Sequence, residues 1–365
     1  MNTLTKEPNN ILVLEVGGIG DAVIATPALN ALRRRFPNAR ITVVASPRAV
    51  EIIWALDLGF RTRTLRLALP LTRLLDAARL ILSTRSNRPD LLIDLSAIET
   101  PAAARRRQRL VALLGARYTL GRNTDGRGDF FDAAVDESLA DETHEVERKL
   151  SVVATLGARP EPAHPIVDVP RAAFESEHLL LEEAGVADFE EVIGIHPGAF
   201  LPTRQWPVDR FARLADLLTR EHHRDLLVTG GEADRDLVEQ VAAAAHHQVV
   251  RAVGRPLMEA AALIRRCRAF VTNDTGMMHV AAALNVPVVA LFGRTNAARY
   301  RPYMPASRCV LLQQPDSACQ DFTPTPDEPE CRRPTCHSRT CMTGIQFDTV
   351  HQAVQQLLER TRGAK

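Results

Sequence analysis

The chain has 365 residues, of which 45% are hydrophobic and 24% are charged, and its formal net charge is +1. With only 5% aromatic residues the cores are expected to be aliphatic, and the charge balance gives the whole molecule no global field for nucleic acid. The length exceeds what one hydrophobic core usually serves, so two domains are expected. No uncharged apolar window approaches the length of a membrane span and no signal-peptide pattern opens the chain, so the sequence predicts a cytoplasmic protein.

The first half alternates apolar runs with segments of helical periodicity. "ILVLEV" (11–16) precedes a glycine-rich turn and a helical segment, and further apolar runs cover 40–46 and 89–96. Continuous apolar strands separated by helices are typical of a parallel sheet covered on both faces. Pro27 falls within the first helical segment, so that helix begins either at Pro27 or near Asp21.

A proline-rich stretch over 158–170 is the predicted linker to a second half with the same pattern. The sequence therefore predicts an α/β protein with two Rossmann-like doubly wound domains facing a central cleft. In the second half the expected strands are 191–198, 225–231, 248–254, 269–274 and 287–293, and the expected helices are 208–222, 232–245, 257–267 and 347–361.

The end of the first expected strand is one candidate ligand site, because parallel sheets bind ligands beyond the carboxyl ends of their strands. Gly17, Gly18 and Gly20 allow a tight turn there, and Asp21 follows them. The turn lacks the third glycine of GxGxxG and the lysine of a P-loop, which counts against a dinucleotide site. Asp21 either caps the next helix or acts as a general base.

A second candidate lies in "HPGAFLPTRQWP" (196–207), which begins where another strand ends. Arg204 in this loop would stabilise negative charge on a departing diphosphate. Trp206 is expected to be a packing anchor.

The third candidate is the turn "NDTG", which begins a short helix. The free amides of Thr275 and Gly276 would form an anion site at the positive end of that helix. Asp274 either caps the helix or accepts a hydrogen bond from a sugar hydroxyl. His279 either donates to phosphate or is a satisfied core residue. Together these groups predict a cradle for a diphosphate sugar.

Arginine clusters in the first third are either solvated helix faces or a surface for an anionic partner. They are Arg33, Arg34 and Arg35; Arg61, Arg63 and Arg66; and Arg105, Arg106, Arg107 and Arg109.

Four of the six cysteines, Cys319, Cys331, Cys336 and Cys341, lie close together near the C-terminus. They either hold a structural zinc or iron ion or belong to a reduced loop stiffened by prolines. Their spacing lacks the CxxC pairs of a strong zinc signature, and disulfides are not expected in a cytoplasmic protein.

Three motifs, "GGIGDAVIATPAL", "HPGA…TRQWP" and "NDTGMMHVAAAL…PVVALFG", resemble in order and spacing those of the glycosyltransferase family 9 heptosyltransferases of lipopolysaccharide core synthesis. The resemblance covers nearly the whole chain. It implies a GT-B fold, an ADP-heptose donor, inversion at the anomeric carbon and no metal needed for transfer. It further implies an N-terminal acceptor domain (1–165), a donor domain (166–346) and a C-terminal helix (347–365) that packs back toward the N-terminal domain.

The resemblance also implies roles for single residues. Asp21 matches the catalytic base, and Arg204 matches a cation that contacts the donor phosphate. The donor-side candidates are His196, Gly198, Glu232, Asp274, Thr275, Gly276 and His279. The acceptor-side candidates are Gly18, Gly20, Arg61 and Arg63, for an anionic or lipid-linked glycan at the inner face of the membrane.

Two other functions fit the same fold. A sugar-nucleotide epimerase would need several acid/base groups, whereas only Asp21 stands out beside the donor motifs. A nucleotide-sugar-binding protein without catalysis would keep Arg204 and the 274–279 turn but would not need Asp21. The fold alone does not decide between these functions.

Overall fold

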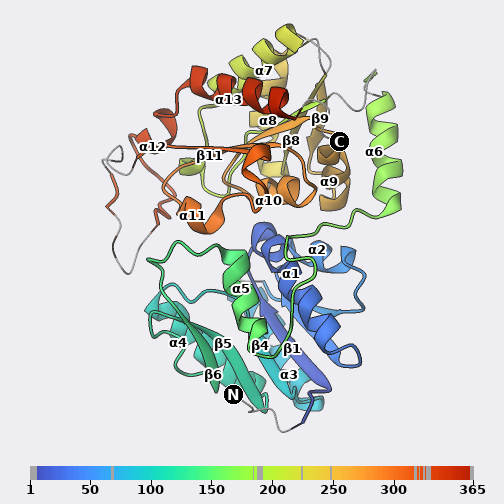
Figure 1. Cartoon of the computed structure of the whole chain (residues 1–365), viewed down its shortest axis with the longest axis vertical. Coiled ribbons are helices and arrows are strands. Elements are labelled where there is room, and N and C mark those ends of the chain that lie inside the picture. The colour runs from blue at the N-terminus through green and yellow to red at the C-terminus, as the bar shows by residue number, and fades with distance from the viewer. Residues whose placement is uncertain are drawn as a thin grey trace. The chain divides into compact units, whose positions relative to one another are not determined.

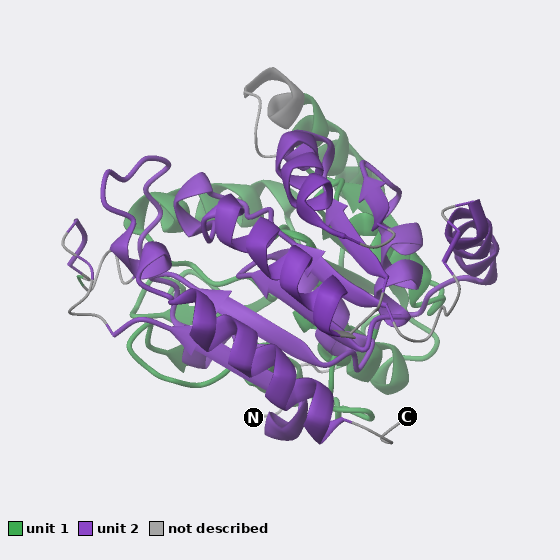
Figure 2. Ribbon diagram, turned by 90° about the horizontal axis from the view of Figure 1, so that it is seen from above, with its two compact units in different colours: residues 1–166, 325–329 green, residues 167–324, 330–365 purple. Residues whose placement is uncertain are grey.

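The computed structural model describes residues 6–66, 70–183, 185–186, 192–222, 225–246, 249–315, 319, 321–323, 325 and 330–361. The chain divides into two compact units, coloured separately in Figure 2. Unit 1 comprises Met1–Ile166 and Thr325–Pro329, and unit 2 comprises Val167–Pro324 and Glu330–Lys365.

Unit 1 is built on a six-stranded sheet with the order β3-β2-β1-β4-β5-β6. Figure 1 labels β1, β4, β5 and β6 of this sheet. All of its strand pairs are parallel. Helix α1 packs against α2 and α5, whereas α3 packs against α4. The elements are β1 (Asn10–Glu15), α1 (Ile19–Arg35), β2 (Arg40–Ala45), α2 (Val50–Ala55), β3 (Arg61–Thr64), α3 (Pro70–Ser86), β4 (Leu91–Asp94), α4 (Pro101–Leu114), β5 (Tyr118–Thr124), β6 (Ala133–Glu137) and α5 (Glu145–Ala154).

Unit 2 repeats this plan with the order β12-β11-β10-β7-β8-β9, again all parallel. The strands are β7 (Ile193–His196), β8 (Leu226–Gly230), β9 (Val249–Val253), β10 (Ala269–Asn273), β11 (Val288–Phe292) and β12 (Cys309–Gln313). The helices are α6 (Arg171–Glu183), α7 (Val208–His222), α8 (Arg235–Ala244), α9 (Leu257–Arg265), α10 (Gly276–Ala283), α11 (Ala297–Tyr300), α12 (Thr340–Thr343) and α13 (Phe347–Arg360).

The expected doubly wound α/β architecture is confirmed. Helix α13 belongs to unit 2, and its apolar stripe, which includes Val350, Val354 and Leu357, lies in the core of that unit. Arg61 and Arg63 lie on strand β3 rather than on a helix face. Of the two alternatives for the first helix, the structure has the earlier start, at Ile19, with Pro27 inside the helix.

A buried ion pair fixes the end of β1. Lys149 Nζ on α5 lies 2.6 Å from Glu15 Oε2, and both side chains are almost fully buried. Lys149 also donates to the carbonyl of Leu95, beyond the end of β4. Burial raises the pKa of the Glu15 carboxyl, and the Lys149 ammonium opposes that rise. One cation therefore ties α5 to the ends of the two central strands.

Replacing Lys149 by Met should destabilise unit 1 by about 3–5 kcal/mol, because Glu15 would remain buried without a cation. Hydrogen exchange at the β1 amides during a urea titration reports on this unit alone. The double variant Glu15→Leu/Lys149→Met should recover most of the loss, since an apolar pair of similar volume often replaces a buried ion pair without cost. A single variant as stable as the wild type would show that the pair does not hold β1.

Candidate functional site

The strand order reverses once in each unit, between β1 and β4 in unit 1 and between β7 and β10 in unit 2. Ligands of doubly wound sheets bind beyond the carboxyl ends of the strands at this reversal. Three of these four strand ends lead directly into the segments singled out by the sequence: the glycine turn after β1, the Arg204 loop after β7 and the Asp274 turn after β10. The sequence order alone did not show that the last two strands are neighbours.

Asp21 lies in the first turn of α1 and does serve as a cap. Its Oδ2 accepts a hydrogen bond of 2.8 Å from the amide of Gly18. A Cβ atom on Gly17 would lie 2.4 Å from Asp21 Cβ, so glycine is required there to leave room for the carboxylate. A carboxylate has about four lone-pair sites, so this bond leaves acceptor capacity for a proton.

The arginine clusters divide into structural and exposed members. Arg33, Arg34 and Arg35 are engaged at the end of α1, where Arg34 pairs with Glu161 and Arg35 with Glu7. Arg107 pairs with the buried Asp94 at the end of β4. The exposed members are Arg61 and Arg63 on β3 and Arg105, Arg106 and Arg109 on α4.

His196 ends β7 as expected and is 6% exposed. Its Nδ1 lies 2.9 Å from Thr229 Oγ1 at the end of β8. Burial lowers the pKa of His196 to about 4, against which the nearby Asp234 carboxylate acts, so the imidazole is neutral at pH 7. The next loop approaches Asp234 as well, because a Cβ atom on Gly198 would lie 2.6 Å from its Oδ2.

Arg204 and Asp274 form a partly buried ion pair between the loop after β7 and the end of β10. Arg204 Nη1 lies 3.1 Å from Asp274 Oδ2, and that oxygen also accepts from Thr295 Oγ1 at 2.6 Å. Arg204 Nη2 donates to the carbonyl of Cys331 at 3.1 Å. Arg204 Nε is buried and has no hydrogen-bond partner in the part of the chain that the structure describes. The guanidinium is thus clamped in place with one donor left unsatisfied.

The helix cap after β10 is Thr275, not Asp274. Thr275 Oγ1 accepts from the amide of Met277, so the alternative in which Asp274 caps α10 is wrong. The cap places the amides at the start of α10 where the sequence predicted an anion site, with Gly276 as the first helical residue. His279 is buried in the second turn of this helix.

Asn273 is a residue whose role the sequence did not reveal. Its Oδ1 accepts from the amide of Trp206 at 3.0 Å, and its Nδ2 donates to the carbonyls of Pro197 and Gly198 at 2.8 and 3.2 Å. One fully buried amide side chain therefore fixes both ends of the loop that carries Arg204. Trp206 is the packing anchor predicted for it, 1% exposed, with Nε1 donating to the carbonyl of Ile345.

Glu232, the remaining donor-side candidate, follows β8 and has an exposed side chain that pairs with Arg235 at 2.8 Å. Gly254 lies against it in a left-handed conformation, at φ +64°, and a Cβ atom there would meet Glu232 Oε2 at 2.5 Å.

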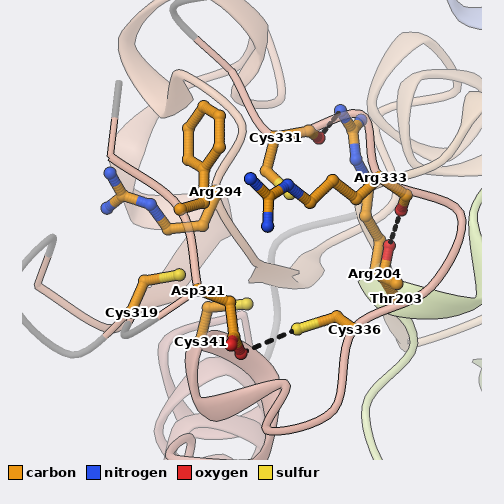
Figure 3. Close-up of a pocket in the computed structure, with 10 residues that line it drawn as sticks. Thr203, Arg204, Arg294, Cys319, Asp321, Cys331, Arg333, Cys336 and Cys341 are labelled. Atoms are coloured by element: carbon orange, nitrogen blue, oxygen red, sulfur yellow. Dashed lines mark hydrogen bonds between the residues drawn. The ribbon is translucent and has the colours of Figure 1, made fainter. Parts of the chain in front are cut away.

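The four clustered cysteines line one small hollow of about 20 Å³ in unit 2 (Figure 3). Arg204, Arg294 and Arg333 line the same hollow. Within the described residues, no three His, Cys, Asp or Glu side chains are arranged to hold a metal ion as they stand.

The donor set nevertheless suits a thiolate-bound metal. Burial and the other three cysteines raise the pKa of the Cys341 thiol to about 11, because neighbouring thiolates repel one another. A divalent cation would remove that repulsion, and the arginines would offset the net negative charge of four thiolates.

The cysteine segment also supports the Arg204 loop. Thr203 Oγ1 donates to the carbonyl of Arg333 at 2.8 Å, and Arg339 Nη1 donates to the carbonyl of Pro202 at 3.3 Å. Together with the bond from Arg204 to Cys331, these contacts make the segment one wall of the Arg204 site.

A family model for glycosyltransferase family 9 (heptosyltransferase) matches residues 108–327, more than half of the chain. The chain belongs to glycosyltransferase family 9. It is therefore a glycosyltransferase, and membership in this family removes the epimerase alternative.

Individual relatives agree with this assignment. The glycosyltransferase is 27% identical over 320 residues to the lipooligosaccharide heptosyltransferase 2 of Haemophilus ducreyi, covering 83% of this chain and 87% of the relative. Its fold is similar to that of the E. coli ADP-heptose LPS heptosyltransferase II, with a TM-score of 0.71, 22% identity and coverage of 97% and 100% of the two chains. The GT-B fold is confirmed by this likeness.

A third similar structure is the dodecameric iron-containing heptosyltransferase TibC in complex with ADP-D-β-D-heptose. The TM-score is 0.58 at 13% identity, with 97% of this chain and 77% of TibC covered. At such identity the likeness concerns the fold alone. Within the described ranges of the glycosyltransferase, no helix combines the length and apolar composition needed to cross a membrane.

The neutral state of His196 predicts a pH-dependent stability. Because its folded pKa lies below the usual value of about 6.5 for an unfolded chain, the unfolded state binds the proton more readily. The stabilisation is complete above about pH 6.5 and is lost as the pH falls toward about 4, amounting to about 3 kcal/mol. Urea unfolding at pH 7 and pH 5 should show a larger loss for the wild type than for His196→Gln. Equal losses would show that the fold does not lower the pKa of His196.

Proposed function

We propose that this glycosyltransferase transfers a heptose from ADP-heptose to an anionic glycan of lipopolysaccharide-core type, with inversion at the anomeric carbon. In this proposal unit 1 binds the acceptor and unit 2 binds the donor. The names of the relatives support the donor and acceptor classes. The observation that carries the site assignment is the clamped Arg204 with its unsatisfied Nε, at the strand reversal of unit 2.

Unit 2 offers two sources of positive charge to a diphosphate. The Arg204 guanidinium is one, and the free amides at the start of α10, after Thr275, are the other. An unsatisfied buried donor costs about 1–3 kcal/mol, and a phosphate oxygen at Arg204 would recover that cost. Asp274 then has the role of orienting Arg204, since its Oδ2 already accepts from that guanidinium and from Thr295.

The remaining donor contacts follow from the sheet edge. Glu232 follows β8, two strands from β10, and its exposed carboxylate can accept hydrogen bonds from ribose hydroxyls. His196 and Gly198 form the wall beneath the donor in this proposal. The His196 side chain is buried, and the Gly198 backbone lies so close to Asp234 that no side chain would fit between them. His279, buried in α10, supports the start of that helix.

Asp21 is the proposed base. Its carboxylate takes the proton of an acceptor hydroxyl while that oxygen forms the new bond to the anomeric carbon. The bond from this carbon to the diphosphate breaks at the same time, and ADP leaves with the electron pair. Charge growing on the leaving phosphate is stabilised by Arg204 and the α10 amides, which act most strongly in the transition state.

The proposed acceptor side of unit 1 has a near and a remote part. Gly18 and Gly20 flank the turn that holds Asp21, so acceptor atoms can approach the backbone there. Arg61 and Arg63 lie on β3, the outermost strand of the sheet. Arg61 is the first residue of this strand and so lies toward the amino ends of the strands, whereas Asp21 follows the carboxyl end of β1. These arginines would attract phosphates of the acceptor rather than touch its reacting hydroxyl.

A structural zinc or iron ion at Cys319, Cys331, Cys336 and Cys341 completes the proposal. Four thiolates with cations around them suit either metal better than magnesium. The metal's place is structural, because Arg204 and the α10 amides supply the positive charge that the leaving group needs.

Asp21→Asn should lower kcat by about 10²- to 10⁴-fold, the usual contribution of a general base. Asparagine can still accept from the Gly18 amide, so the helix cap and the affinity for ADP should be unchanged. Calorimetry with ADP and steady-state kinetics at saturating acceptor separate these effects. A variant that retains most of its kcat would reduce Asp21 to a cap and favour a binding protein or another base.

Arg204→Ala should raise the donor KM and also lower kcat by at least about tenfold, since the cation acts more on the departing phosphate than on the bound donor. Arg204→Lys is the matched control, because it keeps the charge but loses the fork that reaches Asp274 and Cys331. An unchanged kcat with a raised KM would leave Arg204 as a ground-state contact only.

Metal analysis of protein purified without chelator should find about one zinc or iron per chain, as a four-thiolate site binds a single ion. Cys341→Ser should remove it, lower the thermal stability of unit 2 and raise the Kd for ADP, because the freed segment holds Arg204 through the Cys331 carbonyl. Cys309→Ser, on β12 outside the hollow, is the control and should keep the metal. Less than about one-tenth equivalent of metal in the wild type would identify the segment as a plain loop.

A further inference from the structure

The outer faces of α3 and α4 carry leucine and arginine in the same stripes. On α3 the exposed positions recur at helical spacing and include Leu75, Arg79 and Leu82. Leu75 and Leu82 are 50% and 61% exposed, although leucine is a residue that folding usually buries. The inner face of α3, with Leu80, packs on the sheet, so the outer leucines are surplus to the core of unit 1.

Helix α4 continues this surface. Arg106, Arg109 and Leu113 follow one another at helical spacing on its exposed side, and Leu113 is 52% exposed. The inner side, with Val111 and Leu114, belongs to the same apolar core cluster as Leu80 of α3. Because the two helices also contact each other, their outer stripes are neighbours.

The surface is basic with almost no opposing charge. Helix α4 contains no acidic residue, and the one acidic residue of α3, Asp76, is 5% exposed and lies 3.3 Å from Arg66. Arg79 is 78% exposed, and its distance of 4.0 Å from Asp76 leaves most of its charge facing solvent. Solvated helices of a nearly neutral protein usually alternate the two signs of charge, which these do not.

We infer that the α3–α4 surface (Leu75, Arg79, Leu82, Arg106, Arg109 and Leu113) docks unit 1 on an anionic lipid membrane. The inference deepens the proposed function and rests on it, because docking on a membrane serves a transferase whose acceptor is linked to a lipid. Arginines on such a surface are attracted to anionic headgroups, and each strengthens binding about fivefold. Exposed leucines between them enter the boundary between headgroups and acyl chains, as on interfacial amphipathic helices. A lipid surface is favoured over a soluble anion because it alone uses both residue types.

The test is cosedimentation of the full-length protein with vesicles that contain no glycan. Vesicles of phosphatidylcholine with phosphatidylglycerol at about 7:3 should bind the protein, whereas pure phosphatidylcholine should not. Arg79→Glu/Arg106→Glu/Arg109→Glu should weaken binding to anionic vesicles by at least about tenfold. Leu75→Ser/Leu82→Ser/Leu113→Ser should also weaken it, while the remaining binding keeps its sensitivity to salt.

Matched controls lie on α6 of unit 2, where Leu179 is 59% exposed and the Arg171 side chain is 94% exposed. Leu179→Ser and Arg171→Glu should bind vesicles within about twofold of the wild type. Equal binding to neutral and anionic vesicles, or equal losses in the control variants, would overturn the inference. So would loss on charge reversal with no loss in the leucine variant, which would show that the surface recognises anionic charge alone and does not insert into the lipid.

Calorimetry with ADP separates this inference from the proposed function. All variants of the α3–α4 surface should bind ADP as the wild type does, because none of the substituted residues belongs to unit 2. Vesicle binding that persists in a protein without transferase activity would leave the inference standing and the proposed chemistry wrong. Normal transfer to a lipid-free acceptor by a protein that does not bind anionic vesicles would overturn the inference and leave the proposed chemistry standing.

Discussion

A parallel sheet whose strand order reverses leaves two adjacent strand ends uncovered, because the connections on either side of the reversal turn to opposite faces. Both units obey this constraint with the same order of strands along the chain. Polar side chains are expensive inside such sheets, and they are tolerated where a strand ends beside solvent or a ligand. The Asp21 turn, the Arg204 loop and the Asp274 turn occupy those places. The strand order of the two sheets therefore determines where the polar residues of the site can lie.

Many hydrogen bonds in unit 2 hold a single loop, the one after β7 that carries Arg204. Asn273 ties the loop at both ends, Trp206 anchors it in the core, and the cysteine segment supports it through main-chain carbonyls. A long arginine side chain normally loses conformational entropy when it binds a ligand. Because Arg204 is already held by fixed partners, less of this entropy remains to be lost on binding. The ion pair with Asp274 therefore does not compete with a role in binding, because it orients the Arg204 guanidinium.

Much of the fold was predictable from the apolar runs. Buried strands such as β1 and β11 are nearly continuous in apolar residues, and their ends were predicted within a residue or two. Strand β3, "RTRT", was not predicted, because an exposed edge strand needs no apolar face. The packing of α13 into unit 2 was not predicted either, since an amphipathic pattern shows that one face is buried but not against which neighbour.

The site was predictable in its residue types and less so in its contacts. Asp274 stands out in the sequence as a carboxylate at an anion site, a position that predicts either a helix cap or a contact to a sugar hydroxyl. Its main partner, Arg204, is 70 residues away and meets it only because β7 and β10 are neighbours in the sheet. Asn273 belongs to the same polar turn, but the sequence does not show which loop it holds, because an asparagine at a strand end is common in turns. Pairings between distant loops depend on the order of strands, which no local pattern contains.

The supports of the Arg204 loop also set an order of events during synthesis. Strands of unit 1 all lie before residue 138, so the Asp21 turn can reach its final form early, as N-terminal domains generally do. The Arg204 loop cannot, because its carbonyl partners belong to Cys331, Arg333 and Ile345. A nascent chain that has passed Asp274 but not Ile345 contains both members of the ion pair without the wall that positions them. The donor side of the enzyme is therefore completed last, by the same segment that carries the cysteines.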